Sequence, residues 1–320
     1  MKEHKRTFIL IEIILACLVA ILALIMVWER TEEQSKISVI VQNPDDTEWS
    51  AFKYGLEKAA EDRKVDVTVV NTGTIRDVKQ EKQVIEQEVK KGVDAIIFQP
   101  MFGADVEEVL EEVHIPVVLI EYVYSPGKEI ATIPIVGPDQ FEMGAKAAEE
   151  IIRDHAGDLS GKEIGFFSKT ADSSVVLARE KGARETLENA GAKVRWFVSG
   201  NFEETPNEFL NGQSEVDILL ALDDKSLVRW GAYATDMTKE IPTYGIGHST
   251  EAVYYLDTDV VECLVVPDEF NMGYQSIREA VEKMERYKGT SQNQKVSYKV
   301  IRREELFSKE NQESLFTMSQ

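Results

Sequence analysis

The chain has 320 residues, of which 43% are hydrophobic, and its formal net charge at pH 7 is -21. This length and hydrophobic content suffice for two ordinary domains with sizeable cores. The acidic excess argues against a nucleic-acid partner, because no basic surplus is available to replace phosphate counterions. A disulfide between the two cysteines is implausible, since Cys17 lies in a hydrophobic N-terminal segment and Cys263 in an expected buried strand.

An almost wholly apolar run extends from Phe8 to Trp28. Its length matches the roughly 20 residues that a helix needs to cross the hydrocarbon core of a bilayer. Basic residues precede the run and acidic residues dominate the stretch after it, so the positive-inside rule keeps the N-terminus cytoplasmic and exports the rest. We therefore expect a cytoplasmic tail at 1–7, a transmembrane anchor at 8–28, a linker at 29–36 and an extracytoplasmic folded part. Cleavage of the run as a signal peptide, and acylation at Cys17, are the alternatives.

The first folded stretch, from Ile37 to Ala60, indicates a strand, a loop and a helix. Residues 37–41 are short, mostly β-branched and apolar, as expected for a strand covered on both faces of a parallel sheet. A polar turn follows, and then a helix in which Trp49, Phe52 and Leu56 share one face. In open α/β sheets ligands bind outside the carboxyl ends of strands, so this turn and Trp49 stand where a binding site is expected.

The same strand and helix unit repeats along the rest of the chain. Further strands are expected at 65–70, 93–98, 116–120, 130–136, 163–167, 193–198, 217–222, 243–246, 260–266 and 296–301. Helices are expected between them, including a long one at 268–287. Strands that alternate with helices throughout predict an α/β protein with two doubly wound parallel-sheet lobes. The sequence Gly137-Pro138-Asp139 interrupts the pattern and indicates the passage between the lobes.

Several short motifs carry a family resemblance. They are Gly92-Val93-Asp94-Ala95-Ile96-Ile97, Ile115-Pro116-Val117-Val118-Leu119-Ile120, Asp139-Gln140-Phe141-Glu142-Met143-Gly144, Ala178-Arg179-Glu180-Lys181-Gly182 and Phe270-Asn271-Met272-Gly273-Tyr274-Gln275. In this order and spacing the chain, over roughly 37–316, resembles the ribose-type sugar-binding proteins of bacterial ABC importers, which have the type 1 periplasmic binding protein fold. The resemblance implies two lobes joined by three hinge strands, with the ligand in the cleft. It divides the chain into an N-terminal lobe, 37–137 plus 267–294, and a C-terminal lobe, 138–266 plus 295–320.

The resemblance also implies a set of ligand-binding residues. Charged side chains bind sugar hydroxyls through paired hydrogen bonds, and aromatic rings stack on the apolar faces of a sugar. The positions that match the family's site are Asp46, Glu48, Trp49, Glu121, Tyr122, Arg179, Phe202, Asp223, Gly247 and His248. Arg179 matches the family's ligand-contacting arginine and is the strongest single candidate.

Some of these positions depart from the family's pattern. The family's Asp-Arg pair is here Glu121-Tyr122, which keeps a carboxylate and loses a guanidinium, while the family's Asp and hinge Gln are here Gly247 and Pro267. Other interpretations also stand: Trp49 as a core residue, Arg179 as a surface arginine, Asp223 as a helix N-cap. The carboxylates would make the cleft acidic, which leaves open a cationic or amino-sugar ligand, or a bound cation.

Enzyme motifs are missing from the sequence, which has no G-x-S-x-G, no P-loop, no H-E-x-x-H and no C-x-x-C. We therefore expect neither catalytic residues nor a cofactor or a protein-bound metal. The resemblance implies the substrate-binding component of an ABC sugar importer, located at the bacterial cell surface or in the periplasm, that passes a monosaccharide to a permease. The alternative is a membrane-anchored sensing subunit that signals to a histidine kinase or chemoreceptor.

Overall fold

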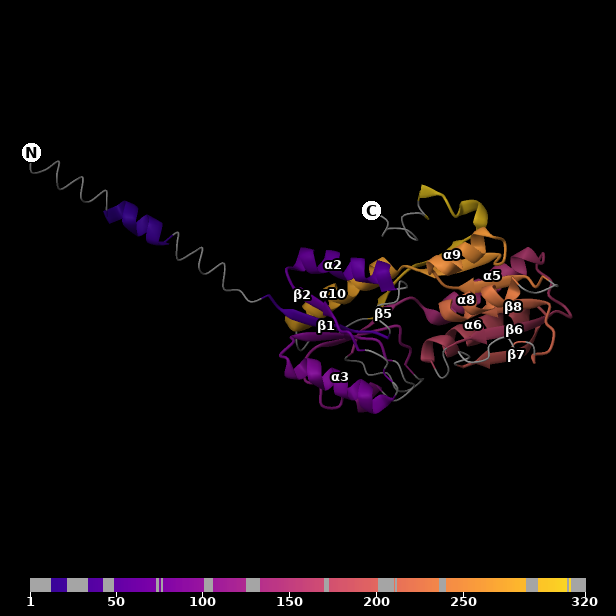
Figure 1. Cartoon of the computed structure of the whole chain (residues 1–320), viewed down its shortest axis with the longest axis horizontal. Coiled ribbons are helices and arrows are strands. Elements are labelled where there is room, and N and C mark those ends of the chain that lie inside the picture. The colour runs from indigo at the N-terminus through magenta and orange to yellow at the C-terminus, as the bar shows by residue number, and fades with distance from the viewer. Residues whose placement is uncertain are drawn as a thin grey trace, which may run out of the picture. The chain divides into compact units, whose positions relative to one another are not determined.

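The computed structural model describes residues 13–21, 34–42, 49–72, 75, 77–100, 106–124, 133–169, 173–200, 210, 212–235, 240–285, 293–309 and 311 (Figure 1). The chain divides into two compact units, Met1–Ser35 and Lys36–Gln320. Both β-sheets and all the hydrophobic core clusters described below belong to the second unit. Three of the expected site residues, Asp46, Glu48 and Phe202, lie outside the described residues.

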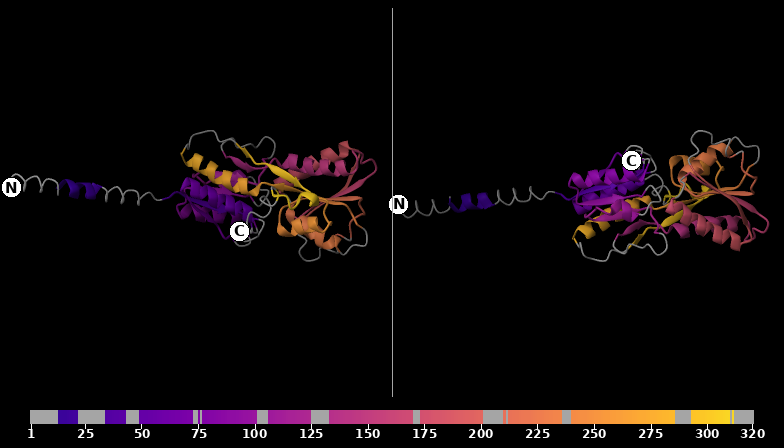
Figure 2. Two further views of the ribbon diagram at one scale, coloured as in Figure 1. Left: turned by 90° about the horizontal axis from the view of Figure 1, so that it is seen from above. Right: turned by 90° about the horizontal axis from the view of Figure 1, so that it is seen from below.

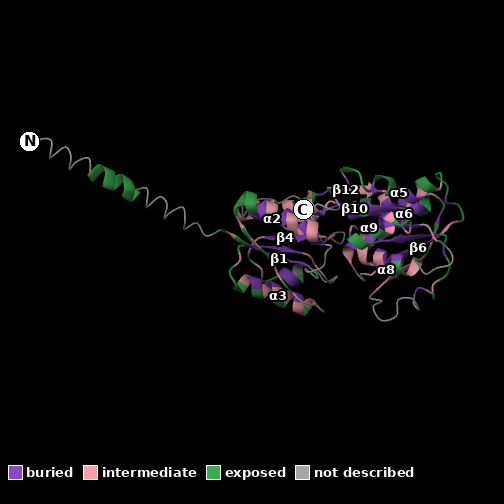
Figure 3. Cartoon of the chain, turned by 45° about the horizontal axis from the view of Figure 1, so that its top comes forward, coloured by how far each residue is buried: buried purple, intermediate pink, exposed green. Residues whose placement is uncertain are grey.

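The first unit contributes one described helix, at 13–21. Its large apolar side chains are exposed (Figure 3), and Cys17 on it is exposed and free. Within the described part of the chain, no helix has the length and apolar character needed to cross a membrane. Most of the expected anchor at 8–28 lies outside the described residues, so the anchor stays a prediction.

The first lobe is built on a six-stranded sheet with the order β11-β5-β4-β3-β1-β2. Its strands are β1 (Lys36–Ile40), β2 (Asp66–Val69), β3 (Ala95–Phe98), β4 (Val117–Ile120), β5 (Ile135–Gly137) and β11 (Gln294–Lys295), and they pair in parallel. Helices α2 (Ser50–Arg63) and α10 (Glu269–Glu285) cover one face, and α3 (Val78–Lys90) and α4 (Val106–Leu110) cover the other. Figure 1 shows α2 and α3 on opposite sides of β1.

Strand β3 illustrates why the central strands of this sheet are mostly apolar. All four of its residues are buried, as are all of β4 and all of β1 after its first residue, Lys36 (Figure 3). Ala95 and Ile97 pack with α2 and α10, whereas Ile96 and Phe98 pack with α3 and α4. Because successive side chains point to opposite faces of a sheet, a strand covered on both faces needs apolar residues at every position.

The second lobe has its own six-stranded sheet, with the order β12-β10-β9-β8-β6-β7. Its strands are β6 (Glu163–Ser168), β7 (Lys193–Ser199), β8 (Ile218–Ala221), β9 (Thr243–Ile246), β10 (Cys263–Pro267) and β12 (Tyr298–Ile301). Helices α5 (Gln140–Asp154) and α6 (Ser174–Asn189) cover one face. Helices α8 (Asp224–Ala234) and α9 (Thr250–Asp257) cover the other, and the 3-10 helix η2 (Arg303–Glu305) follows β12. The expected two-lobed α/β architecture with parallel sheets is confirmed.

The last strand differs from the expectation. Instead of one strand at 296–301, the structure has β11 parallel to β5 in the first sheet and β12 antiparallel to β10 in the second. Val296 lies in the core of the first lobe, whereas Ile301 lies in a core of the second. The residues of the one expected strand therefore serve two separate cores, and their apolar pattern alone cannot show the change of sheet.

The chain passes between the two sheets after β5, after β10 and between β11 and β12. Helix α10 therefore packs against α2 in the first lobe although the strand before it belongs to the second (Figure 2). Glycines allow the backbones of these two helices to touch, because a Cβ at Gly55 would overlap the carbonyl oxygen of Phe270 and a Cβ at Gly273 that of Phe52.

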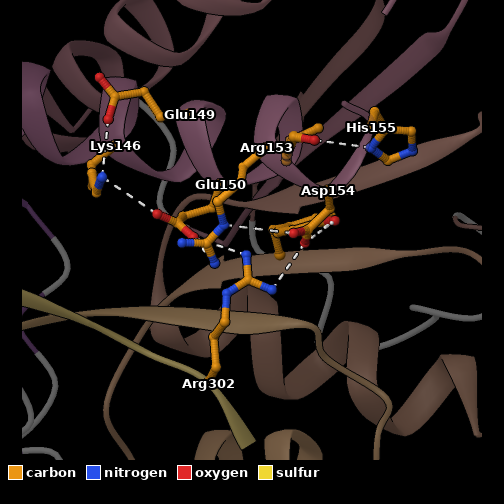
Figure 4. A network of polar contacts seen from close by, with 9 residues as sticks. Lys146, Glu149, Glu150, Arg153, Asp154, His155 and Arg302 are labelled. Carbon is orange, nitrogen blue, oxygen red and sulfur yellow. Dashed lines mark hydrogen bonds and ion pairs between the residues drawn. The ribbon is translucent and has the colours of Figure 1, made fainter. Parts of the chain in front are cut away.

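An ionic network joins α5 to the segment after β12 (Figure 4). The Glu150 carboxylate, whose side chain is only 3% exposed, lies 2.8 Å from Arg302 Nη2 and 2.6 Å from Arg153 Nη2. Arg302 Nη1 also lies 3.0 Å from Asp154 Oδ2, which accepts a hydrogen bond from the hydroxyl of Tyr244 at 2.9 Å. Burial lowers the pKa of Arg302, but its hydrogen bonds to the two carboxylates outweigh burial and raise it. A buried carboxylate of this kind is stable only with such partners.

Candidate functional site

A cavity lies between the lobes, at the carboxyl ends of strands from both sheets. The first lobe contributes Gln42 after β1, Gln99 after β3 and Glu121 after β4 to its walls. The second lobe contributes Arg179 of α6, Asp223 before α8 and Gly247 after β9. This is the location at which open α/β sheets bind ligands.

The structure describes seven of the ten residues that the sequence places in a ligand site, and it brings all seven together on the cavity wall. They are Trp49, Glu121, Tyr122, Arg179, Asp223, Gly247 and His248. Although they are distant in sequence, these residues converge because each stands at a strand end or in the first turns of a helix that follows one.

Arg179 is buried, at 5% exposure, so the alternative of a surface arginine is wrong. Its Nε donates a hydrogen bond to Gln140 Oε1 at 2.7 Å, and its Nη1 donates to the carbonyl oxygen of Leu222 at 3.0 Å. Its Nη2 lies 4.0 Å from Glu121 Oε1 of the other lobe. Two edges of the guanidinium are therefore fixed by its own lobe, and the third points toward the first lobe.

The close approach of α5 and α6 sets the position of the Arg179 backbone. A Cβ at Gly144 of α5 would overlap the carbonyl oxygen of Arg179, and a Cβ at Gly182 of α6 would overlap that of Phe141. The two glycines allow the helices to touch, which brings Gln140, on the first turn of α5, within reach of Arg179.

Glu121 follows β4 directly and has a left-handed backbone conformation, with φ at 45°. Such a conformation is uncommon for a residue other than glycine and often marks a functional position. The Gln99 carboxamide donates to Glu121 Oε2 at 2.8 Å and accepts a hydrogen bond from the backbone N–H of Gln42 at 2.9 Å. The Glu121 carboxylate is thereby held toward the cavity.

Asp223 acts as the N-cap of α8, as one of the alternatives from the sequence proposes. Its Oδ1 accepts a hydrogen bond from the N–H of Ser226 at 2.7 Å. Its Oδ2 accepts from the hydroxyl of Ser168 at 2.6 Å and from the N–H of Lys169 at 2.9 Å. The carboxylate therefore lines the cavity while it also joins the ends of β6 and β8.

The neighbouring Asp224 explains the glycine at position 247. Asp224 Oδ1 accepts hydrogen bonds from the N–H groups of His248 at 2.7 Å and Ser249 at 2.9 Å. A Cβ at Gly247 would lie only 2.5 Å from this oxygen. A carboxylate oxygen from α8 thus occupies the space where a side chain at position 247 would begin, which is where the family has its aspartate.

The aromatic residues of the cavity belong to the core of the first lobe as well. Trp49 is 5% exposed, packs edge-on against Phe52 with ring centroids 5.4 Å apart, and donates from Nε1 to the Gln42 carbonyl oxygen at 2.8 Å. Tyr122 packs edge-on against Tyr124. Trp49 is therefore a core residue that also lines the cavity, and its stacking on a sugar stays a prediction.

The two lobes also meet directly beside the cavity. The N–H of Val123, after β4, donates to the hydroxyl of Ser174 on the first turn of α6 at 3.2 Å. Near the passage between β11 and β12, Lys295 Nζ lies 2.6 Å from Glu142 Oε2 and 3.6 Å from Asp139 Oδ2 at the start of α5. The lobes are thus in polar contact on the cavity side and at the hinge.

The sequence interpretation missed several residues of the cavity wall. Gln42 and Gln99 immediately follow the predicted strands at 37–41 and 93–98, so the rule that found the turn after the first strand also applies to them. Glu269, on the first turn of α10, is 5% exposed and lines the cavity too. Its position depends on the return of the chain to the first lobe, which no local pattern indicates.

The chain belongs to the periplasmic binding protein domain family, whose model matches residues 37–288. It is 23% identical to the D-ribose/D-allose-binding protein of Pseudomonas aeruginosa over 238 residues, which cover 70% of this chain and 73% of that protein. The resemblance to ribose-type binding proteins that the motifs indicate is therefore confirmed.

Solved structures of similar fold cover most of both chains. One is GanP, a glucose-galactose-binding protein from Geobacillus stearothermophilus, with a TM-score of 0.74 and 18% identity over 86% of this chain and 100% of that one. Another is a solute-binding protein of an ABC transporter from Agrobacterium vitis, bound with α-D-tagatopyranose, with a TM-score of 0.77 and 12% identity over 88% and 99% of the two chains. At these identities the likeness concerns the fold.

Proposed function

We propose that this chain binds a monosaccharide in the cavity between its lobes and serves as the solute-binding component of an ABC sugar importer. The observation that carries the proposal is the convergence of Arg179 and Glu121, from opposite lobes, on one cavity. Family membership supports an extracytoplasmic solute-binding domain. The names of its relatives, which include ribose, allose, glucose and galactose among their ligands, support a sugar.

The cavity offers the two kinds of contact that a sugar ring needs. The edge of Arg179 that faces the first lobe would donate to ring hydroxyls, and the Glu121 carboxylate would accept from them, in charge-assisted hydrogen bonds. Trp49 and Tyr122 supply apolar ring surface for the sugar's faces. The work of such a site is binding without covalent chemistry.

Binding would be coupled to the approach of the lobes. A ligand shifts an equilibrium between open and closed forms only through the extra contacts that it makes in one of them. A sugar held by Arg179 and Glu121 at once gains those contacts only when the lobes are together. We expect the closed pair of lobes to be the form that a permease recognises.

The proposal includes a membrane anchor at 8–28 that holds the folded unit outside the cytoplasmic membrane. Two observations support it. The described helix 13–21 carries exposed large apolar side chains, and basic residues precede the apolar run while acidic residues follow it. Protease accessibility of the Lys36–Gln320 unit on whole cells or spheroplasts tests this part of the proposal, and protection of the unit in both would contradict it.

The test of the binding function is calorimetric titration of the full chain, purified in mild detergent, with a panel of neutral and amino monosaccharides. We expect at least one to bind with an affinity in the micromolar range or tighter, and Arg179→Met to weaken it by about tenfold or more. Arg184→Gln is the matched control, because Arg184 is on the same helix and pairs with Glu180 and Glu188. Absence of binding by every sugar in the panel would refute the proposal.

The sensing role that the sequence also permits makes a different prediction about partners. Purification of the chain from its native membrane should recover a permease and an ATPase if it serves uptake. Recovery of a histidine kinase or chemoreceptor in their place would support the sensing alternative.

A further inference from the structure

The second lobe places two carboxylates side by side after β8, and it uses them differently. Both oxygens of Asp223 accept hydrogen bonds from groups of its own lobe. Asp224, the first residue of α8, accepts from the N–H groups of His248 and Ser249 with Oδ1 alone, at 2.7 and 2.9 Å. Asp224 also lines the cavity and is only partly buried. The two neighbours therefore differ in what they still offer to a ligand.

Oδ2 of Asp224 is the oxygen that the protein leaves open. It accepts no hydrogen bond from any residue that the structure describes, and it is not a buried atom. An ionised carboxylate oxygen can only accept, so its partner in the cavity must be a donor such as a hydroxyl. The charge needs no counter-ion from the ligand, because two N–H groups and the N-terminus of α8 stabilise it.

The contacts on Oδ1 fix the position of this carboxylate. Asp224 begins α8, whereas His248 and Ser249 follow β9, and Ser249 is the N-cap of α9. The side chain is therefore held between two helix starts at the same edge of the second sheet. A ligand would meet an acceptor that is already oriented, which lowers the entropic cost of binding.

Gly247 shows what this carboxylate replaces. A Cβ at position 247 would lie 2.5 Å from Asp224 Oδ1 and 3.1 Å from Asp224 Cα, so position 247 has no room for an aspartate while Asp224 stands where it does. Both residues line the cavity. The carboxylate that the family resemblance leads one to expect from residue 247 is thus supplied in the same space by residue 224.

We propose that Asp224 is a specificity-determining residue of the cavity, whose Oδ2 accepts a hydrogen bond from one hydroxyl of the sugar ring. The inference rests on the proposed function, because it adds a ligand contact to the same cavity. Asp224 then has two roles at once: Oδ1 ties the start of α8 to the end of β9, and Oδ2 distinguishes a sugar that has the hydroxyl from one that lacks it.

The test asks whether Asp224 and one ring hydroxyl act as a pair, by calorimetric titration of the full chain in mild detergent. The probe is the tightest binder among D-ribose, D-allose, D-glucose, D-galactose, D-glucosamine and D-galactosamine, together with its monodeoxy analogues. We expect one analogue to bind the unmodified chain at least about tenfold more weakly than the parent sugar. Asp224→Asn should bind the parent sugar about tenfold more weakly, and that analogue within about threefold of the unmodified chain. Discrimination at this one ring position would then be lost, while discrimination against the other analogues persists.

Asp224→Asn keeps an oxygen that can accept from His248 and Ser249, so the variant should melt like the unmodified chain. Asp217→Asn is the matched control, because Asp217 stands at the opposite end of β8, where its carboxylate accepts the N–H of Glu163 at 2.9 Å. It should leave the affinity for the parent sugar within about threefold. A crystal structure of the unmodified chain with the parent sugar is an independent measurement. It should place one ring hydroxyl about 2.5–3.0 Å from Asp224 Oδ2.

The outcomes separate the two proposals. Equal losses for the parent sugar and all its analogues in Asp224→Asn, or no loss at all, would overturn the role of Asp224 in specificity and leave the monosaccharide function intact. A crystal structure in which no hydroxyl of the bound sugar reaches Asp224 would do the same. Failure of every sugar to bind the unmodified chain would overturn the binding function itself, and this inference with it.

Discussion

Glu121 Oε1 of the first lobe lies 4.0 Å from Arg179 Nη2 of the second, and each side chain is held by a glutamine of its own lobe. Gln99 donates to Glu121 at 2.8 Å, and Gln140 accepts from Arg179 at 2.7 Å. Each of the two charged groups is therefore oriented by contacts within its own lobe. A ligand between them would find both groups in place, which lowers the entropic cost of binding.

Gln140 is a positioning residue for Arg179, and its replacement tests this role. Gln140→Leu removes the acceptor for Arg179 Nε, so the guanidinium should turn from its present orientation. Because a buried charged donor that loses its partner costs about 1–3 kcal/mol, we expect sugar affinity to fall by about tenfold. Gln140→Glu, which keeps an acceptor oxygen, should restore much of the affinity in calorimetric titration, while Glu149→Gln on the exposed part of α5 serves as the control. Equal sugar affinities of the Gln140→Leu variant and the unmodified chain would show that Arg179 keeps its orientation without Gln140.

Gly144 tests whether the contact between α5 and α6 sets the site. Gly144→Ala places a methyl group against the Arg179 carbonyl oxygen and should push the two helices apart. We expect a loss of about 1–3 kcal/mol in the free energy of unfolding, from overpacking, together with weaker sugar binding. Urea unfolding followed by circular dichroism measures the first effect. Glu149→Ala, exposed on the same helix, should leave the free energy of unfolding nearly unchanged.

Much of the fold follows from local patterns. The run Ala95-Ile96-Ile97-Phe98 is apolar at each position because it serves two cores, and strands of this kind separated by helical periodicities predict doubly wound sheets. The split of the last strand into β11 and β12 does not follow from local patterns, because Val296 packs in the core of the first lobe and Ile301 in a core of the second. Assigning them requires knowledge of where the chain crosses.

The candidate site is predictable to a similar degree. Arg179 and Glu121 are indicated by motif positions, and a rule about strand ends would add Gln42 and Gln99. Two other features depend on contacts between elements far apart in sequence. They are the position of Glu269 on the cavity wall and the Asp224 carboxylate that occupies the space beside Gly247. A single sequence carries no signal for such contacts.

The ionic network of the second lobe should contribute to stability through its most buried carboxylate. Arg302→Met leaves Glu150 with fewer partners, and breaking a buried ion pair typically costs about 3–5 kcal/mol. Because Arg302 is 21% exposed and Glu150 keeps Arg153 and Lys146, we expect the lower end of that range or less, about 2–3 kcal/mol. The matched control is Arg303→Met, which removes only the exposed pair with Asp259 and should cost under about 1 kcal/mol. Equal shifts of the urea midpoint in the two variants would contradict the special role of Arg302.

Cys263 provides a test of the packing of β10. The residue is fully buried, and burial raises the pKa of its thiol to about 12. Since the thiolate is the reactive form, the thiol should not react with a disulfide reagent at about pH 8 while the chain is folded. In a Cys17→Ser chain, Cys263 is the sole thiol, so labelling should rise from none to one equivalent as guanidinium chloride unfolds the protein. The labelling midpoint should coincide with the loss of circular dichroism. Rapid labelling of the folded Cys17→Ser chain would show that β10, the strand beside the edge strand β12, opens to solvent without global unfolding.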